Sequence, residues 1–391
     1  MRSSMSLKFC SGIFALICLV FSGSVYAQPS QGIFGYWANL NPADNDDHTN
    51  VTVPFIGHAD EATATTDILQ ELSAASSQGV QVILFVKPFL FESPVDSNGF
   101  MKQNSSYTLD PNATSQFNSL VQTLKSNGYL VPNDPSSSTV LAFGIVDEPE
   151  LHGLKDQGGS AHPALQSAIN VVQNHPDTSS FPTYINVHHN WGDAAKGVRL
   201  SDWASTTDYW ASTSGYISHF LNFTNHLLSG QKAILLPQAS YGGSLMNQYG
   251  PWHDPDQIFD RFADDSRIIG IIPFLWSHAD TDGVTDIPSL KTAWTNYGKQ
   301  IKLDSIVDVS VNCYDVPPSW ENFECYVNAS GGTGGYSYDW SNGETGTLAE
   351  YSLQCPHPQS GTGSDVSEQV EVIVTDNSGR YRIGTDVIQC P

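Results

Sequence analysis

Cysteine is missing from most of this chain. Six cysteines occur among the 391 residues, and none lies between Cys18 and Cys313. A disulfide therefore cannot brace the long central segment, which has to be stabilised by burial of its own apolar core. A chain of this length is expected to form one large domain and a small one.

Basic residues are scarce as well. The chain carries 16 Lys and Arg against 40 Asp and Glu, which gives a formal net charge of −24. An acidic surface repels the phosphates of nucleic acids and of anionic membranes, so we expect neither as a partner. The same charge favours a soluble protein, which we expect to be a monomer.

No long apolar run follows the N-terminal region, so a membrane-spanning helix is not expected. The first 27 residues have the pattern of a secretory signal peptide. Arg2 and Lys8 precede the short apolar stretch Gly12–Phe21, and a small-residue cleavage pattern ends at Ala27. We expect residues 1–27 to be removed and the mature protein to be secreted, to the periplasm or the extracellular space.

The other four cysteines lie close together near the end of the sequence. Cys313, Cys325, Cys355 and Cys390 are an even number in a chain that is expected to be exported. This predicts two disulfides. Three pairings are possible, and the sequence does not choose among them.

Several common catalytic and cofactor motifs are absent. No Gly-rich phosphate turn follows an early apolar run, which argues against a nucleotide-binding open sheet. No Gly-x-Ser-x-Gly elbow is present, so a serine hydrolase is not expected. No Asp/His cluster has metal-ligand spacing, and the neighbours His188 and His189 are expected to point to opposite faces of a strand. We expect neither a metal nor another cofactor.

Residues 28–303 are predicted to form a (β/α)8 TIM barrel, an α/β fold. Eight short apolar runs lack polar alternation, as strands buried on both faces do, and amphipathic stretches lie between most of them. Helical crossovers between eight such strands favour a closed barrel over a doubly wound open sheet. The runs are Gly32–Trp37, Val51–Ile56, Val80–Phe85, Val140–Val146, Thr183–Val187, Asp208–Ala211, Ala233–Pro237 and Ile268–Leu275.

Residues 304–391 are predicted to form a small all-β, immunoglobulin-like sandwich. Short alternating segments separated by Gly, Ser and Asn replace the helical periodicity there. The stretches Ala329–Gly343 and Val372–Gly379 resemble the polycystic-kidney-disease-type β-sandwich. The resemblance implies an accessory domain of a secreted enzyme, in which Trp340 either fills the core or stacks on a sugar.

In a (β/α)8 barrel the active site lies at the carboxyl ends of the strands. Every apolar run in this chain ends on aromatic, ionisable or amide side chains. Side chains of these types around the barrel mouth fit a carbohydrate. Sugar rings have apolar faces that stack on Trp and Tyr, and hydroxyl groups that bind carboxylates, amides and imidazoles. The candidate substrate-binding residues are Tyr36, Trp37, Lys87, His188, Tyr209, Trp210, Gln238, Tyr241 and Trp276.

The fourth run ends on two adjacent carboxylates, Asp147 and Glu148, followed by Pro149. A buried carboxylate is costly unless it is paired or used, and a neighbouring carboxylate disfavours its ionisation. One of the pair is therefore expected to keep a proton, as a general acid needs. Lys87, one strand away, could tune the pair or bind a substrate oxygen. The structural alternative is that Asp147 caps a helix that begins at Pro149.

This strand ending resembles the Asn-Glu-Pro of a large clan of retaining glycoside hydrolases built on the same barrel. In that clan the Glu is the acid/base; Glu148 matches it, and Asp147 stands in the position of the Asn. The pair Trp276-Ser277 also resembles the clan's Trp, often followed by Ser, that forms the floor of the sugar site. The resemblance implies that Glu148 is the general acid/base.

One departure from the clan leaves the mechanism open. The clan's nucleophile is a Glu at the end of the seventh strand, and here that run ends on Gln238. The explanations are a different second carboxylate, a barrel that binds glycans without cleaving them, or a substrate-assisted reaction. The substrate-assisted reaction occurs in barrel hexosaminidases, which carry an adjacent Asp-Glu pair. Asp147-Glu148 resembles that pair. Candidates for a second carboxylate are Glu61, Glu92, Asp265, Asp280 and Asp282.

The sequence therefore predicts an exported glycoside hydrolase that cleaves a polysaccharide or oligosaccharide. Glu148 is expected to be the general acid/base, and Asp147 its partner. The alternatives are a substrate-assisted N-acetylhexosaminidase-type enzyme that uses the same pair, and a non-catalytic glycan-binding surface protein.

Overall fold

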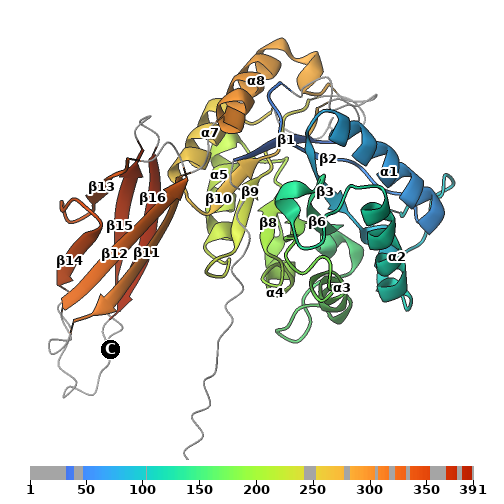
Figure 1. The fold of residues 1–391 in the computed structure, drawn as a ribbon, viewed down its shortest axis with the longest axis horizontal. Helices are drawn as coiled ribbons and strands as arrows, with labels where there is room; N and C mark the ends of the chain where they lie inside the picture. The colour runs from blue at the N-terminus through green and yellow to red at the C-terminus, as the bar shows by residue number, and fades with distance from the viewer. Residues whose placement is uncertain are drawn as a thin grey trace, which may run out of the picture.

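The computed structural model describes most of the chain. The described residues are 32–38, 47–102, 104–241, 252–276, 282–303, 307–316, 322–331, 335–352, 367–376 and 381–389. The expected signal peptide lies outside them. In the described part a parallel β-barrel is followed by two antiparallel sheets (Figure 1). No helix among these residues is both long and apolar enough to cross a membrane.

The barrel closes through parallel pairing in the order β1-β10-β9-β8-β7-β6-β3-β2. Strand β1 pairs with β2 on one side and with β10 on the other, so the sheet has no free edge. The prediction of a (β/α)8 barrel followed by an all-β sandwich is confirmed. The barrel strands are β1 (Ile33–Trp37), β2 (Val51–Val53), β3 (Gln81–Phe85), β6 (Val140–Asp147), β7 (Thr183–Val187), β8 (Trp203–Thr206), β9 (Lys232–Leu235) and β10 (Ile268–Ile271).

The sixth barrel strand is β8, Trp203–Thr206, and the predicted run Asp208–Ala211 is wrong. The prediction looked for a continuous apolar run, whereas β8 carries buried polar side chains. Ser205 is fully buried, and its hydroxyl contacts the Tyr184 hydroxyl at 2.5 Å and the Asn186 Oδ1 at 2.7 Å. Polar strand residues are stable inside the barrel because they bond to one another. The residues of the predicted run form the turn after the strand.

Helices cover the outside of the barrel, and side chains cap the first turns of α1, α3, α5 and α7. At the start of α1, Asp60 accepts a hydrogen bond from the Thr63 N–H at 2.9 Å, and at the start of α5, Ser212 accepts one from Gly215 at 3.2 Å. The helices are α1 (Glu61–Ser77), α2 (Ala113–Ser126), α3 (Pro163–Gln173), α4 (Ala195–Val198), α5 (Thr213–Thr224), α7 (Pro255–Asp264) and α8 (Pro288–Leu303). Shorter elements are β4 (Phe91–Glu92), β5 (Thr108–Leu109) and the 3₁₀ turns η2 (Lys87–Phe89), η3 (Pro135–Ser137), η4 (Pro149–His152), η5 (Trp191–Ala194) and η6 (Val284–Asp286).

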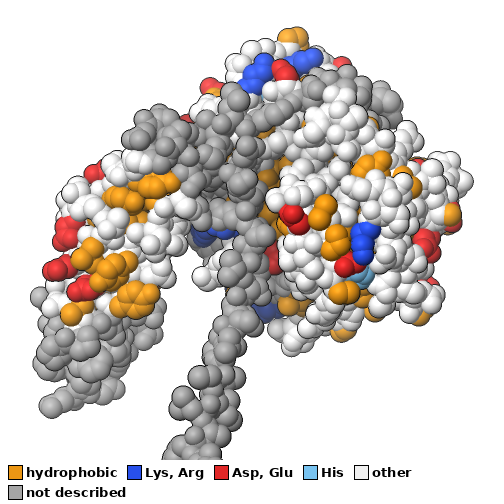
Figure 2. All heavy atoms as spheres, viewed as in Figure 1, with side chains coloured by type: hydrophobic (Ala, Val, Ile, Leu, Met, Phe, Trp, Pro, Cys, Tyr) orange, Lys and Arg blue, Asp and Glu red, His pale blue; other side chains and the backbone are white. Residues whose placement is uncertain are grey.

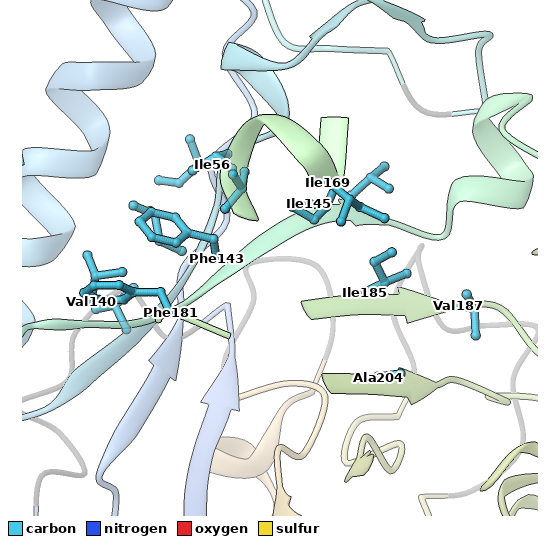
Figure 3. Close-up of a cluster of buried hydrophobic side chains, with 14 of the residues drawn as sticks. Ile56, Val140, Phe143, Ile145, Ile169, Phe181, Ile185, Val187 and Ala204 are labelled. Carbon is cyan, nitrogen blue, oxygen red and sulfur yellow. The ribbon is translucent and has the colours of Figure 1, made fainter. Parts of the chain in front are cut away.

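Two layers of buried side chains stabilise the barrel. The outer layer fills the space between strands and helices, and Figure 3 shows Phe143 and Phe181 packed within it. The inner layer lies inside the barrel and includes Phe85 and Tyr184. The interior is closely packed, because a Cβ at Gly144 would lie 2.7 Å from the Phe85 ring.

The antiparallel strands form two three-stranded sheets, ordered β11-β12-β14 and β13-β15-β16. They enclose a core of their own, in which Trp340 is 3% exposed, so Trp340 fills the sandwich interior and does not stack on a sugar. Figure 1 shows β16 passing beside α7, and Figure 2 shows hydrophobic side chains exposed along the sandwich. The strands are β11 (Val307–Asp315), β12 (Asn322–Gly331), β13 (Ser337–Trp340), β14 (Leu348–Ser352), β15 (Ser367–Thr375) and β16 (Tyr381–Gln389).

A disulfide joins Cys313 of β11 to Cys325 of β12, where the two residues stand directly opposite each other. This selects one of the three possible pairings for the first two cysteines. Cys355 and Cys390 lie outside the described residues.

Candidate active site

The site is built where β6 ends. Asp147 is the last residue of the strand, and Glu148 follows with φ 49° and ψ 60°, the left-handed conformation. A non-glycine residue in this conformation costs roughly 1–2 kcal/mol. Two restraints hold it: the Glu148 N–H donates to the Asn186 carbonyl on β7 at 2.8 Å, and Pro149 begins η4. The turn separates the two neighbouring carboxylates, which share one mouth of the barrel. Asp147 therefore ends a strand and caps no helix.

The Glu148 carboxyl is in a state suited to proton donation. Thr207, just after β8, donates its hydroxyl to Glu148 Oε1 at 3.0 Å. Burial, together with the negative charge of Asp147, raises the pKa of Glu148 to about 8, although the Thr207 hydrogen bond opposes the rise. The group is therefore largely protonated at neutral pH while it remains at the end of a barrel strand.

Asp147 has more support for its charged form. Burial raises its pKa, whereas the Asn186 amide and the Lys87 ammonium act against the rise. The Asn186 Nδ2 donates to Asp147 Oδ1 at 2.6 Å, and Asn186 is itself fixed by Ser205 at 2.7 Å. Since a cation favours ionisation at Asp147 and an anion disfavours it at Glu148, Asp147 is the first of the pair to lose its proton.

Lys87 lies at the carboxyl end of β3, the neighbour of β6. Its side chain is almost completely buried, and burial lowers the pKa of its ammonium group while the charge of Asp147 raises it. The Nζ atom also lies 5.4 Å from the centre of the Phe55 ring, a cation–π contact. Lys87 thus links the carboxylate pair to an aromatic residue that follows β2.

Glu150 is a third carboxyl of this site that the sequence interpretation missed. It is 4% exposed, and its Oε1 accepts a hydrogen bond from the His188 N–H. Its Oε2 is buried and has no hydrogen-bond partner among the described residues. Burial raises the pKa of Glu150 to about 8. The run Asp-Glu-Pro-Glu was the available signal, but a residue after proline does not reveal in sequence whether it faces inward.

His188 and His189 do not point to opposite faces, so that expectation is wrong. Both follow the end of β7, where the alternation of a strand no longer applies, and their ring centroids are 3.8 Å apart. Burial and the neighbouring imidazole lower the pKa of His188 to about 4, so the ring is neutral at neutral pH. Among the described residues, no group of three or more His, Cys, Asp or Glu is placed to hold a metal ion.

Three of the predicted sugar-binding aromatics are buried in the protein. Tyr36 and Trp276 lie with ring centroids 4.5 Å apart, and the Tyr36 hydroxyl contacts His48 Nε2 at 3.0 Å. Trp37 packs inside the barrel, 5.2 Å from the Phe85 ring. Tyr36 and Trp276 belong to the outer layer between strands and helices, and Trp37 belongs to the inner layer. The contact of these three rings with a sugar stays a prediction.

Three other aromatics lie higher at the mouth. The Tyr209 ring stacks on Phe274 with centroids 5.0 Å apart, and burial together with the charges of Glu148 and Asp147 raises its pKa. Trp210 is 51% exposed and Tyr241 is 49% exposed. The turn after β8 therefore places one ring close to the carboxylates and one at the surface.

Gln238 is fully buried beyond β9, and its Nε2 donates to the Ser240 carbonyl at 2.9 Å.

Among the candidate second carboxylates, Asp265 is bound by Arg267 at 2.8 Å just before β10, at the opposite end of the barrel, so it is not part of this site. Glu61 lies in the first turn of α1, Glu92 is the exposed last residue of β4, and Asp282 is exposed just before η6. Asp280 lies outside the described residues.

Two hollows lie at opposite ends of the barrel. One, of about 570 Å³, follows β2 and is lined by Phe55, Asp96, Phe100, Met101 and Lys102. The other, of about 710 Å³, is lined by residues at the amino ends of the strands, such as Ile33 and Gln81. The smaller hollow is on the side of the carboxylates, and the larger is on the far side.

Comparisons with known proteins give no match to any family model and none to any curated protein. Solved structures with a similar chain trace include an FMN-binding beta-glucuronidase from Facaelibacterium prausnitzii, with 11% identity and a TM-score of 0.44 over 92% of this chain and 56% of that one. A GH113 beta-1,4-mannanase has 13% identity and a TM-score of 0.42 over 69% of this chain and 99% of that one. A Cellulomonas fimi endo-beta-1,4-mannanase has 10% identity and a TM-score of 0.41 over 92% of this chain and 94% of that one. All three are glycosidases.

Proposed function

We propose that this protein is a glycoside hydrolase that cleaves the glycosidic bonds of a polysaccharide, with Glu148 as the general acid. The observation that carries the proposal is the buried Glu148 carboxyl at the end of β6, whose pKa is raised to about 8 by burial and by the charge of Asp147. It sits beside a second carboxylate that is better able to stay charged. Such a pair, with unequal proton affinities at one strand end, is the arrangement that glycoside hydrolysis requires.

In the proposed reaction Glu148 donates its proton to the glycosidic oxygen while the bond from that oxygen to the sugar C1 breaks. The bonding electrons go to the oxygen, which leaves as a hydroxyl group, and positive charge develops on the sugar ring. The ionised Asp147 stabilises this charge. Water supplies the hydroxyl group that completes the sugar product, and its proton returns to Glu148.

A substrate-assisted reaction is the second candidate, and the support for Asp147 favours it. Gln238 lies beyond β9, the seventh barrel strand in chain order, and cannot be a nucleophile, while Asn186 and Lys87 both act on Asp147. In this version the ionised Asp147 orients an acetamido group of the substrate, whose oxygen attacks C1. The substrate would then be an N-acetylhexosaminide.

The remaining assignments belong to the same proposal. Tyr209, Trp210 and Tyr241 would contact the sugars, and His188 and Gln238 would close the pocket floor. The protein would be secreted as a monomer after loss of residues 1–27. The barrel, residues 28–303, would carry the activity, and residues 304–391 would be an accessory sandwich.

The direct test is reducing-sugar release by wild type and by Glu148→Gln on a panel of marine, plant and chitin-type polysaccharides. We expect wild type to cleave at least one, and the variant to lose at least about a hundredfold in kcat, as removal of a general acid does. Glu371→Gln, an exposed carboxyl on β15, is the matched control and should keep the wild-type rate.

Each of the other outcomes favours one of the alternative functions or mechanisms. If wild type cleaves a glycan and Glu148→Gln keeps its rate, Glu148 is not the acid, and Glu92 and Asp282 are the next carboxyls to replace. If wild type binds a glycan and releases no reducing ends, the protein is a glycan-binding protein and the enzyme proposal is wrong. Cleavage of chitin-type substrates alone would select the substrate-assisted reaction.

A further inference from the structure

Phe55 is an exposed aromatic residue that no part of the proposed chemistry uses. It follows β2 by two residues and is 48% exposed, although its neighbours Pro54 and Ile56 are buried. It forms one wall of the 570 Å³ hollow, together with Phe100 and the polar groups of Asp96 and Lys102. An aromatic wall with polar groups around it is a typical lining for a bound sugar.

The Lys87 side chain links the wall of the hollow to the carboxylate site. The Lys87 Nζ lies 5.4 Å from the centre of the Phe55 ring, and the same ammonium interacts with the charge of Asp147. Lys87 is 4% exposed, so it fills the space between the hollow and the carboxylates. The cation near the Phe55 ring restrains that ring, which is still half exposed to solvent.

A second exposed aromatic lies on the other side of the carboxylates. Trp210 is 51% exposed in the turn after β8. In the closed strand order, β2 and β8 stand four places apart and are therefore opposite each other across the barrel, and β6 lies midway between them. Asp147 and Glu148 at the end of β6 are thus flanked by Phe55 on one side and Trp210 on the other.

We propose that a polysaccharide chain lies across the barrel mouth from Phe55 to Trp210, so that the enzyme cleaves bonds within the chain and not at its ends. The inference rests on the proposed function and adds to it a mode of attack and a sugar-binding residue, Phe55. Two separated stacking rings on both sides of the acid hold sugars on both sides of the bond that breaks. An enzyme that removes single terminal sugars needs rings on one side only.

The test uses the full chain and the polysaccharide that wild type cleaves in the panel. Phe55→Ala should lower kcat/KM on the polymer about tenfold, the effect of losing one well-packed contact of about 1.4 kcal/mol. Its rate on a short aryl glycoside, which does not reach the hollow, should stay within about twofold of wild type. Phe55→Trp keeps an aromatic face and should retain activity on the polymer. Tyr314→Ala, at a 60% exposed position on β11, is the control for loss of a surface ring.

The products give a second, independent measurement. Wild type should release a mixture of internal fragments early in the reaction, and the Glu148→Gln variant should bind longer oligosaccharides of the same glycan more tightly than short ones. Release of single sugars only, or equal rates for Phe55→Ala and wild type on the polymer, would overturn the inference and leave the proposed function standing. A wild type that cleaves no glycan overturns the proposed function, and this inference fails with it.

Discussion

At the scale of single residues, the site depends on three carboxyls placed at the end of one strand. Asp147, Glu148 and Glu150 lie within four consecutive positions, and each has a different hydrogen-bond partner. The left-handed turn at Glu148 and the proline after it keep the side chains from pointing the same way. The resulting difference, with Asp147 ionised before Glu148, comes from the Asn186 amide and the Lys87 ammonium, which both favour the charged form of Asp147.

The raised pKa of Glu150 predicts how stability depends on pH. The folded protein keeps the Glu150 proton up to about pH 8, whereas the unfolded chain loses it near 4.5. Because the unfolded chain binds fewer protons in this window, the free energy of unfolding falls as pH rises from about 4.5 to about 8. Below the window this contribution to stability is complete.

Glu150→Gln should remove this dependence. The amide oxygen can still accept the His188 N–H, and a neutral group replaces the buried acid. We expect the melting temperature of the variant to exceed that of wild type by at least about 2 °C at pH 8 and to match it near pH 4.5. Glu92→Gln is the exposed control. An equal shift at both pH values would show that the Glu150 proton does not affect stability.

Residue types and their order could be predicted from the sequence here, but burial could not. The adjacent carboxylates Asp147 and Glu148 stand at the end of a barrel strand, as the apolar run before them indicated. The aromatic residues were all predicted to face a sugar, yet Tyr36 and Trp276 pack against each other in the wall of the barrel. Aromatic side chains fit both a core and a sugar site, so only their neighbours in space separate the two.

At the scale of elements, most barrel strands could be predicted, and β8 could not. Seven runs overlap strands in the structure because Val, Ile and Leu fill both faces of each strand. Strand β8 contains Ser205 and Thr206, whose hydroxyls bond to residues that lie about 20 positions away along the chain. Hydrogen bonds between polar side chains and partners that are distant along the chain leave no local signal in the sequence.

The pair β11 and β12 gives a prediction at this scale. The Cys313–Cys325 disulfide closes a segment with a separation of 12 residues, and removal of such a link costs about 3 kcal/mol in the chain-entropy account. The barrel and the sandwich have separate cores. Cys313→Ser with Cys325→Ser should therefore lower only the melting transition of the sandwich.

Calorimetry on the full chain checks this, with glycan cleavage as the second measurement. Two transitions are expected in wild type, and the double variant should shift one of them and keep the wild-type rate on a soluble substrate. Ser310→Ala, on the same strand, is a control substitution that does not remove the disulfide. A loss of activity, or a shift of both transitions, would show that the two parts unfold together.

At the scale of the whole molecule, the architecture places all of the proposed chemistry at one mouth of the barrel. Strands β2, β3, β6, β7 and β8 each contribute a residue there from the loop that follows it, as parallel strands in a barrel do. The fold class followed from the repeated apolar runs. The substrate does not follow from the fold, because it depends on exposed loop residues such as Phe55 and Trp210.

The most direct test of the account is how the activity of the Glu148→Gln variant depends on the leaving group of the substrate. Aryl glycosides of the sugar that wild type releases are hydrolysed with either a dinitrophenol leaving group, which needs no proton, or a phenol, which does. If Glu148 is the general acid, the variant should lose at least about a hundredfold in kcat/KM on the phenyl substrate and stay within about tenfold of wild type on the dinitrophenyl substrate. Equal losses on both substrates would contradict the account, because they would show that Glu148 acts at a step other than protonation of the leaving oxygen.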